Sequence, residues 1–325
     1  MVASSGSKRS TNKVPHAQEP AAEEVWMDNL EDAFSTIQDL AESYPYIAMD
    51  TLLPGIVVQP TGPFDSYAEY NYQTLKCNVD LTRSLQISIT LADADGIRPK
   101  GISTWKFNFN YDASKDFLVQ DRRDALRLDL EKHETQGIEP VQFGEQLMSS
   151  GLVLNEEVKW IVFHGSSSFS DRPPAEHMSG HAGGEQACVT FSGMYNFGYL
   201  LQLLTSSALP DEIVGFRENL DLFFPTRCDM AGHLHQLPPG PPLSSRDHTD
   251  PLRRPLFCSA HHVLEAFFQL PDSVKLTAFD LVTEQPVAAV KTCRSHNRRC
   301  RDDANAQSNL KNGLRAGPDL QVVVH

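Results

Sequence analysis

The sequence predicts a mixed α/β domain in which helices cover a central sheet. Three observations predict this class. Short, continuously apolar runs at residues 46–50 and 158–163 are typical of strands buried on both faces. Strict alternation of apolar and polar residues at 105–109 is typical of a half-buried strand. Segments with apolar residues every three or four positions separate these runs and indicate helices that pack on the sheet.

The first predicted elements lead to an acidic residue. Apolar residues recur at helical spacing over residues 25–40, so we expect a helix there with Glu23 and Glu24 in its first turn. A buried strand then covers residues 46–50 and ends in Asp50. The end of such a strand is where α/β folds often place their chemistry, which makes Asp50 the first candidate functional residue.

A hairpin and a series of helices complete the predicted domain. Residues 85–91 and 105–109 read as strands, and the turn-forming residues at 93–96 lie between them. A helix is predicted over residues 141–150, and Gly151 directly after it is the residue type that commonly ends a helix. Further helices are predicted at residues 113–136, 197–204, 210–224 and 260–270.

One segment interrupts this pattern. Residues 165–186 are rich in Ser, Pro and Gly and show no periodicity, so we expect a surface insertion there. The run 188–193 that follows it repeats the character of residues 161–165. We expect only one of the two copies to join the sheet, and the spacing to the next helix favours residues 188–191.

The domain boundaries follow from composition. We expect a disordered tail at residues 1–22 and a folded domain at 22–235. A divergent, partly disordered region is expected at 236–325, after a proline-rich break.

Composition excludes several classes of protein. The formal net charge of −14 argues against a generic basic nucleic-acid binder. There is no run of 18 apolar residues, so we expect no membrane span, and the N-terminal residues lack the apolar stretch of a secretory signal. The six cysteines are scattered, which indicates a reducing compartment, the cytosol or the nucleus.

Several blocks of sequence, in order, resemble one known family. They are YIAMDT with PGIV (46–51 and 54–57), YNYQTLKCNVDL (70–81), STWKFNF (103–109), LMSSGLVL (147–154) and FSGMYNFGYLLQLLT (191–205). Together they resemble the CCR-four-associated factor deadenylases, which are the poly(A)-specific 3′-exoribonuclease subunits of the CCR-four–NOT complex. The resemblance covers roughly residues 22–235 and breaks once, at the insertion.

The resemblance implies a ribonuclease-H-like exonuclease fold of the type that uses four carboxylates from three motifs. In such enzymes the carboxylates hold two divalent cations, Mg²⁺ or Mn²⁺, which stabilise the attacking water and the leaving oxygen of a phosphoryl displacement. It also implies poly(A) RNA as substrate, the large scaffold subunit of the complex as partner, and a place in both nucleus and cytoplasm.

The family's acidic positions can be compared with this chain one by one. Asp50 matches the first aspartate and is the metal ligand that the resemblance assigns. Leu52 stands where the family has a glutamate, and Asn196 stands where it has the second-motif aspartate. The third motif is not recognisable, although His261 could take the place of its last aspartate. Because an amide oxygen carries no charge and a leucine cannot bind a metal, one carboxylate remains of four.

Three interpretations stay open at this point. The chain could be a deadenylase that acts in poly(A)-tail shortening and mRNA decay with degraded motifs. It could be an inactive pseudo-deadenylase that serves as a binding or scaffold subunit. Alternatively, residues 165–186 and 237–325 could come from translated intron or frame-shifted sequence in an active deadenylase. Transcript sequencing across both boundaries distinguishes the last interpretation from the first two.

Overall fold

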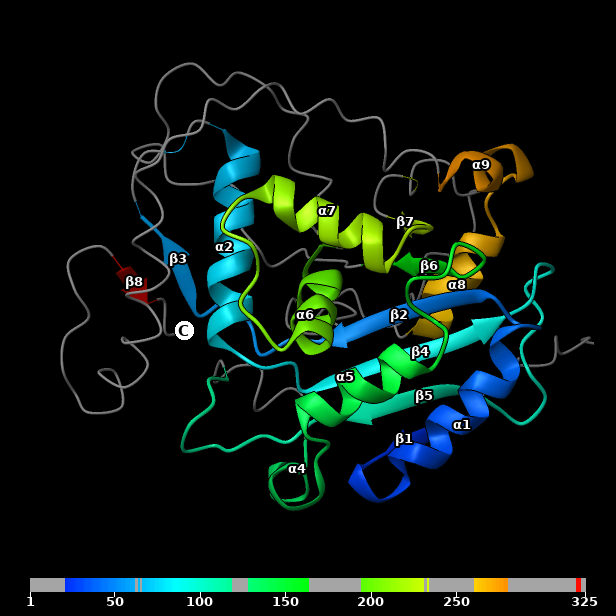
Figure 1. Cartoon of the computed structure of the whole chain (residues 1–325), viewed down its shortest axis with the longest axis horizontal. Helices are drawn as coiled ribbons and strands as arrows, with labels where there is room; N and C mark the ends of the chain where they lie inside the picture. The colour runs from blue at the N-terminus through cyan, green and yellow to red at the C-terminus, as the bar shows by residue number, and fades with distance from the viewer. Residues whose placement is uncertain are drawn as a thin grey trace, which may run out of the picture.

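The computed structural model describes residues 21–61, 64, 66–118, 128–163, 194–230, 233, 260–279 and 320–322. Within them, six strands form one mixed sheet in the order β1-β5-β4-β2-β6-β7 (Figure 1). The strands are β1 (Ala21–Val25), β2 (Tyr46–Leu52), β4 (Gln86–Ala92), β5 (Ile102–Asn108), β6 (Lys159–Val162) and β7 (Arg227–Asp229). The predicted α/β class is therefore confirmed.

Strand β2 lies in the middle of this sheet. It pairs antiparallel with β4 and parallel with β6. Because side chains alternate along a strand, Ile47 and Met49 enter the larger core cluster while Ala48 enters a separate one. Asp50 and Leu52 have the same parity as Ala48, so they belong to that second face.

Helices cover the two faces unequally. The face of Ile47 and Met49 packs against α1 (Leu30–Ala41), α5 (Pro140–Ser149) and α6 (Met194–Thr205). The other face packs against α8 (Ala260–Phe268), whose residues join Ala48 in the second cluster. The packing of the sheet thus extends past residue 235. The remaining described helices are η1 (Met27–Asn29), α2 (Tyr67–Leu81), α4 (Leu130–Gln136), α7 (Ile213–Phe223) and α9 (Asp272–Thr277).

The N-terminal prediction needs correction. The predicted helix over residues 25–40 begins only at Leu30, and Glu23 and Glu24 lie in strand β1 instead of a first helical turn. β1 pairs in parallel with β5, and Val25 is fully buried there. Hydrogen bonding to β5 determines the conformation of residues 21–25, although Val25 also fits the apolar spacing of the helix that follows.

The repeated-strand prediction also needs correction. Strand β6, the earlier copy, lies between β2 and β7, so the place beside β2 is occupied by Lys159–Val162. Residues 188–191, which the spacing favoured, and the predicted insertion at 165–186 lie outside the described residues.

The helices predicted at 141–150, 197–204, 210–224 and 260–270 are confirmed to within a few residues, whereas of the range 113–136 only Leu130–Gln136 is helical and residues 119–127 lie outside the described residues. β4 and β5 form the hairpin, and Asp93 shapes its turn by accepting hydrogen bonds from the amides of Asp95 and Ile97. Gly151 follows α5 with a φ of +74°, a conformation that favours glycine. None of the helices in the described ranges is long and apolar enough to span a bilayer.

Candidate functional site

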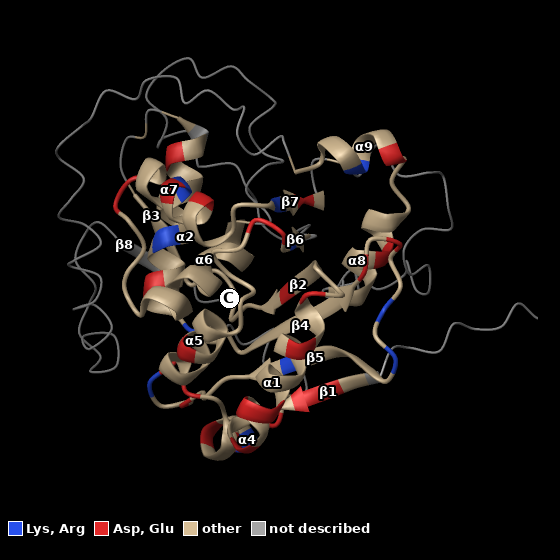
Figure 2. Cartoon of the chain, turned by 45° about the vertical axis from the view of Figure 1, so that its right-hand side comes forward, with Lys and Arg blue, Asp and Glu red and all other residues tan. Residues whose placement is uncertain are grey.

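The candidate site lies at the C-terminal end of β2. Asp50 is half-buried there and faces Ser88 across the antiparallel pair with β4, while Leu52 faces Gln86. Strands β4 and β5 separate β2, which carries Asp50, from β1 with its acidic pair, and Figure 2 shows acidic colouring on both β1 and β2. The structure therefore places Asp50 where the sequence predicted it, at the end of a central strand.

Leu52 occupies an apolar environment. It is only 9% exposed and forms a small cluster with Leu85 and Tyr111. Partly buried leucines pack against this cluster, namely Leu118, Leu128 and Leu130. The leucines around this position offer a cation no oxygen ligand, and the one hydroxyl of the cluster, that of Tyr111, donates to the carbonyl of Asp116. A cation bound here would therefore lose its hydration without gaining an anionic ligand. The position at which the resemblance implies a glutamate is thus part of the hydrophobic core.

Asn196 lies on the first turn of α6 and is fully buried. Neither its Oδ1 nor its Nδ2 has a hydrogen-bond partner in the described part of the chain. Asn196 lies inside α6 and does not serve as its N-cap, because the helix begins two residues earlier at Met194. A buried polar group without partners costs about 1–3 kcal/mol, so this amide is an unusual feature of the core.

His261 stands on the first turn of α8, on the helix that packs against the face of Ala48. Its ring lies against that of His262, with centroids 3.9 Å apart and the ring planes tilted by 38°. Burial is the main cause of a pKa of about 4 for His261. The neighbouring His262 and the cations Arg98 and Lys106 act in the same direction. His261 is therefore neutral at pH 7, in surroundings that disfavour a further positive charge.

A polar row that sequence reasoning missed crosses the same face of the sheet. Asp50 pairs with Ser88, Ser88 pairs with Lys106, and Lys106 pairs with Glu24 in adjacent strands. The Lys106 ammonium lies 3.0 Å from a Glu24 carboxylate oxygen, and Asn108 donates to the other oxygen at 2.9 Å. The alternation of residues 105–109 contained the signal, since its polar members must face away from the buried aromatic ones.

These residues do not fit a centre for two divalent cations. Two dications need several anionic ligands to offset their mutual repulsion. Among the residues that the structure describes, no group of three or more His, Cys, Asp or Glu side chains could hold a metal ion. Asp50 remains as a carboxylate at the expected place, Asn196 is neutral, Leu52 is apolar and His261 has cations around it.

Comparisons with known proteins agree with the resemblance. The chain is 36% identical over 210 residues to "Poly(A) ribonuclease pop2" of Schizosaccharomyces pombe, covering 64% of this chain and 54% of that protein. It is also 36% identical over 216 residues to "Probable CCR4-associated factor 1 homolog 7" of Arabidopsis thaliana, covering 68% of that protein. The chain thus spans about half the length of the first relative and about two thirds of the second. No protein-family model matches it.

Solved structures show the same relationship. The Mg²⁺- and Mn²⁺-bound form of S. pombe Pop2p matches with a TM-score of 0.55 and 36% identity, over 65% of this chain and 73% of that one. The structure of the yeast NOT1 MIF4G domain co-crystallised with CAF1 matches with a TM-score of 0.53 over 82% of this chain and 92% of that one. At 23% identity, this second likeness bears on the fold alone. The expected ribonuclease-H-like fold is confirmed.

Proposed function

This chain belongs to the Pop2/CAF1 family of deadenylase subunits, and we propose that it is a member with little or no nuclease activity, acting by binding. One observation carries the proposal. The position of the family's glutamate, Leu52, is packed into an apolar cluster, and the position of its second aspartate, Asn196, is a buried neutral amide. A single carboxylate at Asp50 cannot offset the repulsion between two dications.

The setting of the chain is proposed from its relatives. One relative is named as a poly(A) ribonuclease and another as a probable CCR4-associated factor. The structure of S. pombe Pop2p contains Mg²⁺ and Mn²⁺. We place this chain in the same assembly, the CCR4–NOT complex, close to poly(A) RNA and in both nucleus and cytoplasm. A divalent cation bound through Asp50 would polarise a phosphate oxygen, but the residues present give it too few anionic ligands.

The structure offers a surface for binding a protein partner. A groove of about 460 Å³ lies between α5 and α6 and the residues that follow α6. Val141 and Met148 line it while remaining 53% and 41% exposed. Because α5 and α6 cover the face opposite to Asp50, a partner seated in this groove would leave the face of Asp50 free. We propose the large scaffold subunit of the complex as this partner, the kind of partner that the NOT1–CAF1 structure contains.

Two measurements test the proposed function. The first incubates the purified chain with end-labelled RNA carrying an adenosine tail and Mg²⁺ or Mn²⁺, with S. pombe Pop2 as the active control. We expect the tail to keep its length. Stepwise shortening that disappears in Asp50→Ala would overturn the proposal, because it would show that the site works despite its substitutions.

The second measurement follows binding to the NOT1 MIF4G domain by size-exclusion chromatography. We expect a complex with the wild-type chain and its loss in Val141→Glu/Met148→Glu, because two added carboxylates beside Glu145, which also lines the groove, would remain unpaired on docking. Leu222→Glu is the matched control, since Leu222 is 59% exposed on α7 and does not line the groove. Equal binding of all three chains would contradict the proposed docking surface.

A further inference from the structure

The groove between α5 and α6 has a floor formed by close packing of the two helices. They lie side by side on one face of the sheet (Figure 1). Gly144 of α5 allows their close approach, because a side chain at its position would collide with the carbonyl oxygen of Leu203 on α6. Both residues are buried, and both line the groove. A groove that is already formed loses little conformational freedom on docking, which favours binding.

One charged side chain interrupts the apolar stripe along this groove. Val141, Glu145 and Met148 stand at positions i, i+4 and i+7 of α5, so they share one face of the helix. All three side chains are exposed, and all three line the groove. The carboxylate of Glu145 is therefore placed between the two apolar side chains that a docked partner covers.

The described part of the chain supplies no cation to Glu145. Within those residues its carboxylate takes part in no ion pair. The helices α1, α5 and α6, which cover this face of the sheet, contain no Lys or Arg. The segment after α6 has no basic residue before Arg217, while it contributes Asp211 and Glu212. These elements thus give the groove an acidic frame.

A partner that covers Val141 and Met148 also removes water from the carboxylate between them. A carboxylate that loses its water has to gain a cation or hydrogen-bond donors, since otherwise its burial opposes binding. Because the helices around the groove provide no cation, the compensating charge has to come from the partner. The guanidinium of Arg and the ammonium of Lys both form strong, charge-assisted hydrogen bonds with a carboxylate.

We propose that the α5–α6 groove selects a basic protein surface, in which an apolar side chain packs between Val141 and Met148 and a neighbouring Lys or Arg pairs with Glu145. This inference rests on the proposed function, in which the groove binds the scaffold subunit, and it adds the chemistry which that subunit presents. Val141 and Met148 supply apolar contact area, and Glu145 determines specificity. The acidic frame favours the approach of a basic surface and repels an acidic one.

Substitutions of Glu145 test the pairing, with binding to the NOT1 MIF4G domain measured by isothermal titration calorimetry. Glu145→Gln should weaken binding at least about tenfold, and Glu145→Lys should abolish it. Glu145→Leu separates the alternatives by the sign of its effect. If the partner supplies a cation, the leucine leaves that cation unpaired and weakens binding. If it supplies none, the leucine removes a burial cost and strengthens binding. Unchanged or tighter binding of Glu145→Leu would overturn the proposal.

Glu218 provides the matched control for these substitutions. It is exposed on α7 and does not line the groove, so Glu218→Leu and Glu218→Lys make the same changes of charge elsewhere on the surface. They should change the affinity less than about threefold, because distant exposed charges are screened by salt. Equal effects of the Glu145 and Glu218 substitutions would show that total charge, and no local pair, governs binding, and would also overturn the proposal.

Two designed peptides separate this inference from the identity of the partner. Both form an amphipathic helix with leucines on one face, and one carries lysines beside that face where its twin carries glutamates. We expect the lysine peptide to bind the wild-type chain but neither Glu145→Lys nor Val141→Glu/Met148→Glu, and we expect the twin to bind none of them. If the lysine peptide behaves in this way while the MIF4G domain does not bind, the proposed partner is wrong and the chemistry of the groove is supported. Equal binding of the lysine peptide to wild type and Glu145→Lys, or a wild-type chain that binds neither peptide, would overturn the inference.

Discussion

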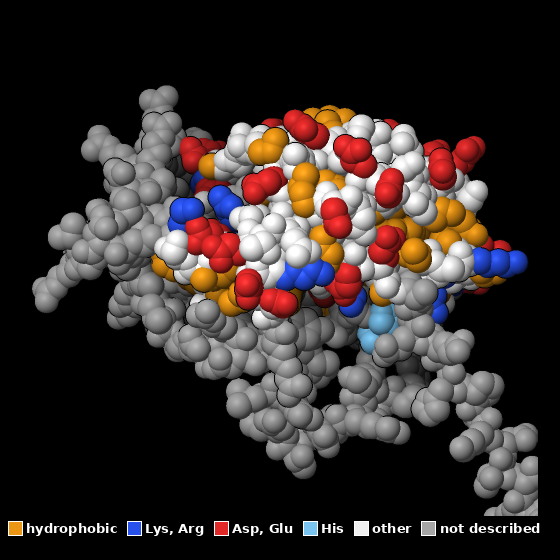
Figure 3. Space-filling model, turned by 90° about the horizontal axis from the view of Figure 1, so that it is seen from below, with side chains coloured by type: hydrophobic (Ala, Val, Ile, Leu, Met, Phe, Trp, Pro, Cys, Tyr) orange, Lys and Arg blue, Asp and Glu red, His pale blue; other side chains and the backbone are white. Residues whose placement is uncertain are grey.

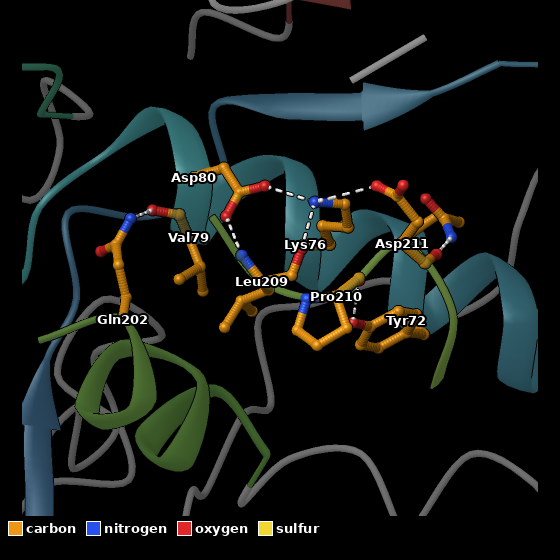
Figure 4. Close-up of polar contacts among 9 residues, drawn as sticks. Tyr72, Lys76, Val79, Asp80, Gln202, Leu209, Pro210 and Asp211 are labelled. Atoms are coloured by element: carbon orange, nitrogen blue, oxygen red, sulfur yellow. Dashed lines mark hydrogen bonds and ion pairs between the residues drawn. The ribbon is translucent and has the colours of Figure 1, made fainter. Parts of the chain in front are cut away.

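Lys76 and Asp80 form a buried ion pair on α2, with the Lys76 ammonium 2.7 Å from an Asp80 oxygen. The Lys76 side chain is 3% exposed, and its ammonium also donates to the carbonyl of Leu209 at 2.6 Å. The other Asp80 oxygen accepts from the Leu209 amide at 2.8 Å, so both charges bind the same residue of the loop before α7 (Figure 4). This arrangement fixes the segment between α6 and α7 against α2.

Replacing Lys76 by Met should destabilise the fold by about 3–5 kcal/mol, because it leaves the Asp80 carboxylate buried without its cation. The free energy of unfolding in urea measures the effect. Adding Asp80→Leu to Lys76→Met should recover part of the loss, since no charge then remains buried. Lys115→Met is the control: Lys115 pairs with Asp112 at 75% exposure, and its loss should cost less than about 1 kcal/mol. A Lys76→Met chain as stable as wild type would show that the pair is dispensable.

The stability should fall in mildly acidic solution because of His133. This side chain is 2% exposed, its Nδ1 lies 2.8 Å from the carbonyl oxygen of Phe109, and burial lowers its pKa. The unfolded chain takes up a proton near the ordinary pKa of about 6.5, whereas the folded chain does so only at lower pH. His133 therefore favours unfolding progressively as the pH falls from about 6.5 toward its lowered pKa.

Urea unfolding of wild type and His133→Gln over that pH range measures this effect. The variant should lose stability at neutral pH, where it gives up the packing of His133 against Trp26. It should then show a shallower decline on acidification than wild type. Parallel curves for the two chains would assign the acid sensitivity to other groups, such as carboxylates that pair in the fold.

The sequence could predict the central strands because their apolar runs and alternation are set by local packing. The alternation at 105–109 predicts a half-buried strand, and its aromatic residues Trp105 and Phe107 are fully buried. It could not predict β1, because that strand exists only through its pairing with β5, and Glu23 and Glu24 read equally well as a helix start. The local sequence pattern predicts a strand poorly when its hydrogen bonds come from a strand that is distant in the sequence.

The candidate site was predictable in part. Asp50 and Leu52 could be placed on one face of a strand by alternation alone. The row that brings Lys106 into register with Asp50 depends on two strand pairings, and the surroundings of His261 depend on how α8 crosses the sheet. Such relationships between distant residues have no signature in a single sequence. The excess of acidic residues, by contrast, follows directly from composition, and acidic side chains are spread over the face of the described residues that Figure 3 shows.

Asn196 provides a prediction about stability. Its buried amide has no hydrogen-bond partner, so Asn196→Leu should be neutral or stabilise the fold by up to about 2 kcal/mol. Asn196→Asp has the same shape but adds a charge at a fully buried place, and it should destabilise the fold at pH 7. Thermal unfolding of the two variants gives the comparison. If Asn196→Leu proved much less stable than wild type, the amide would have a partner that the described residues do not include.

Restoring the two lost acidic residues should not restore an enzyme. In Leu52→Glu the new carboxylate enters the cluster of Leu85 and Tyr111, where burial raises its pKa and favours the protonated form, which binds cations poorly. In the double variant Leu52→Glu/Asn196→Asp, the third motif is still missing, and His261 and its cationic neighbours remain in place.

The double variant should therefore be less stable than wild type, by about 2–4 kcal/mol or more. Mg²⁺ at millimolar concentration should not raise its melting temperature, because a cation stabilises a fold only as far as it binds it. Leu52→Gln/Asn196→Asp is the control that keeps the shape at position 52 without the charge. Melting curves with and without Mg²⁺, together with an assay on adenosine-tailed RNA, test both expectations.

A Mg²⁺-dependent rise in melting temperature, accompanied by tail shortening, would mean that the rest of the metal centre survives in this chain. Its remaining ligands would then lie beyond the residues that the structure describes.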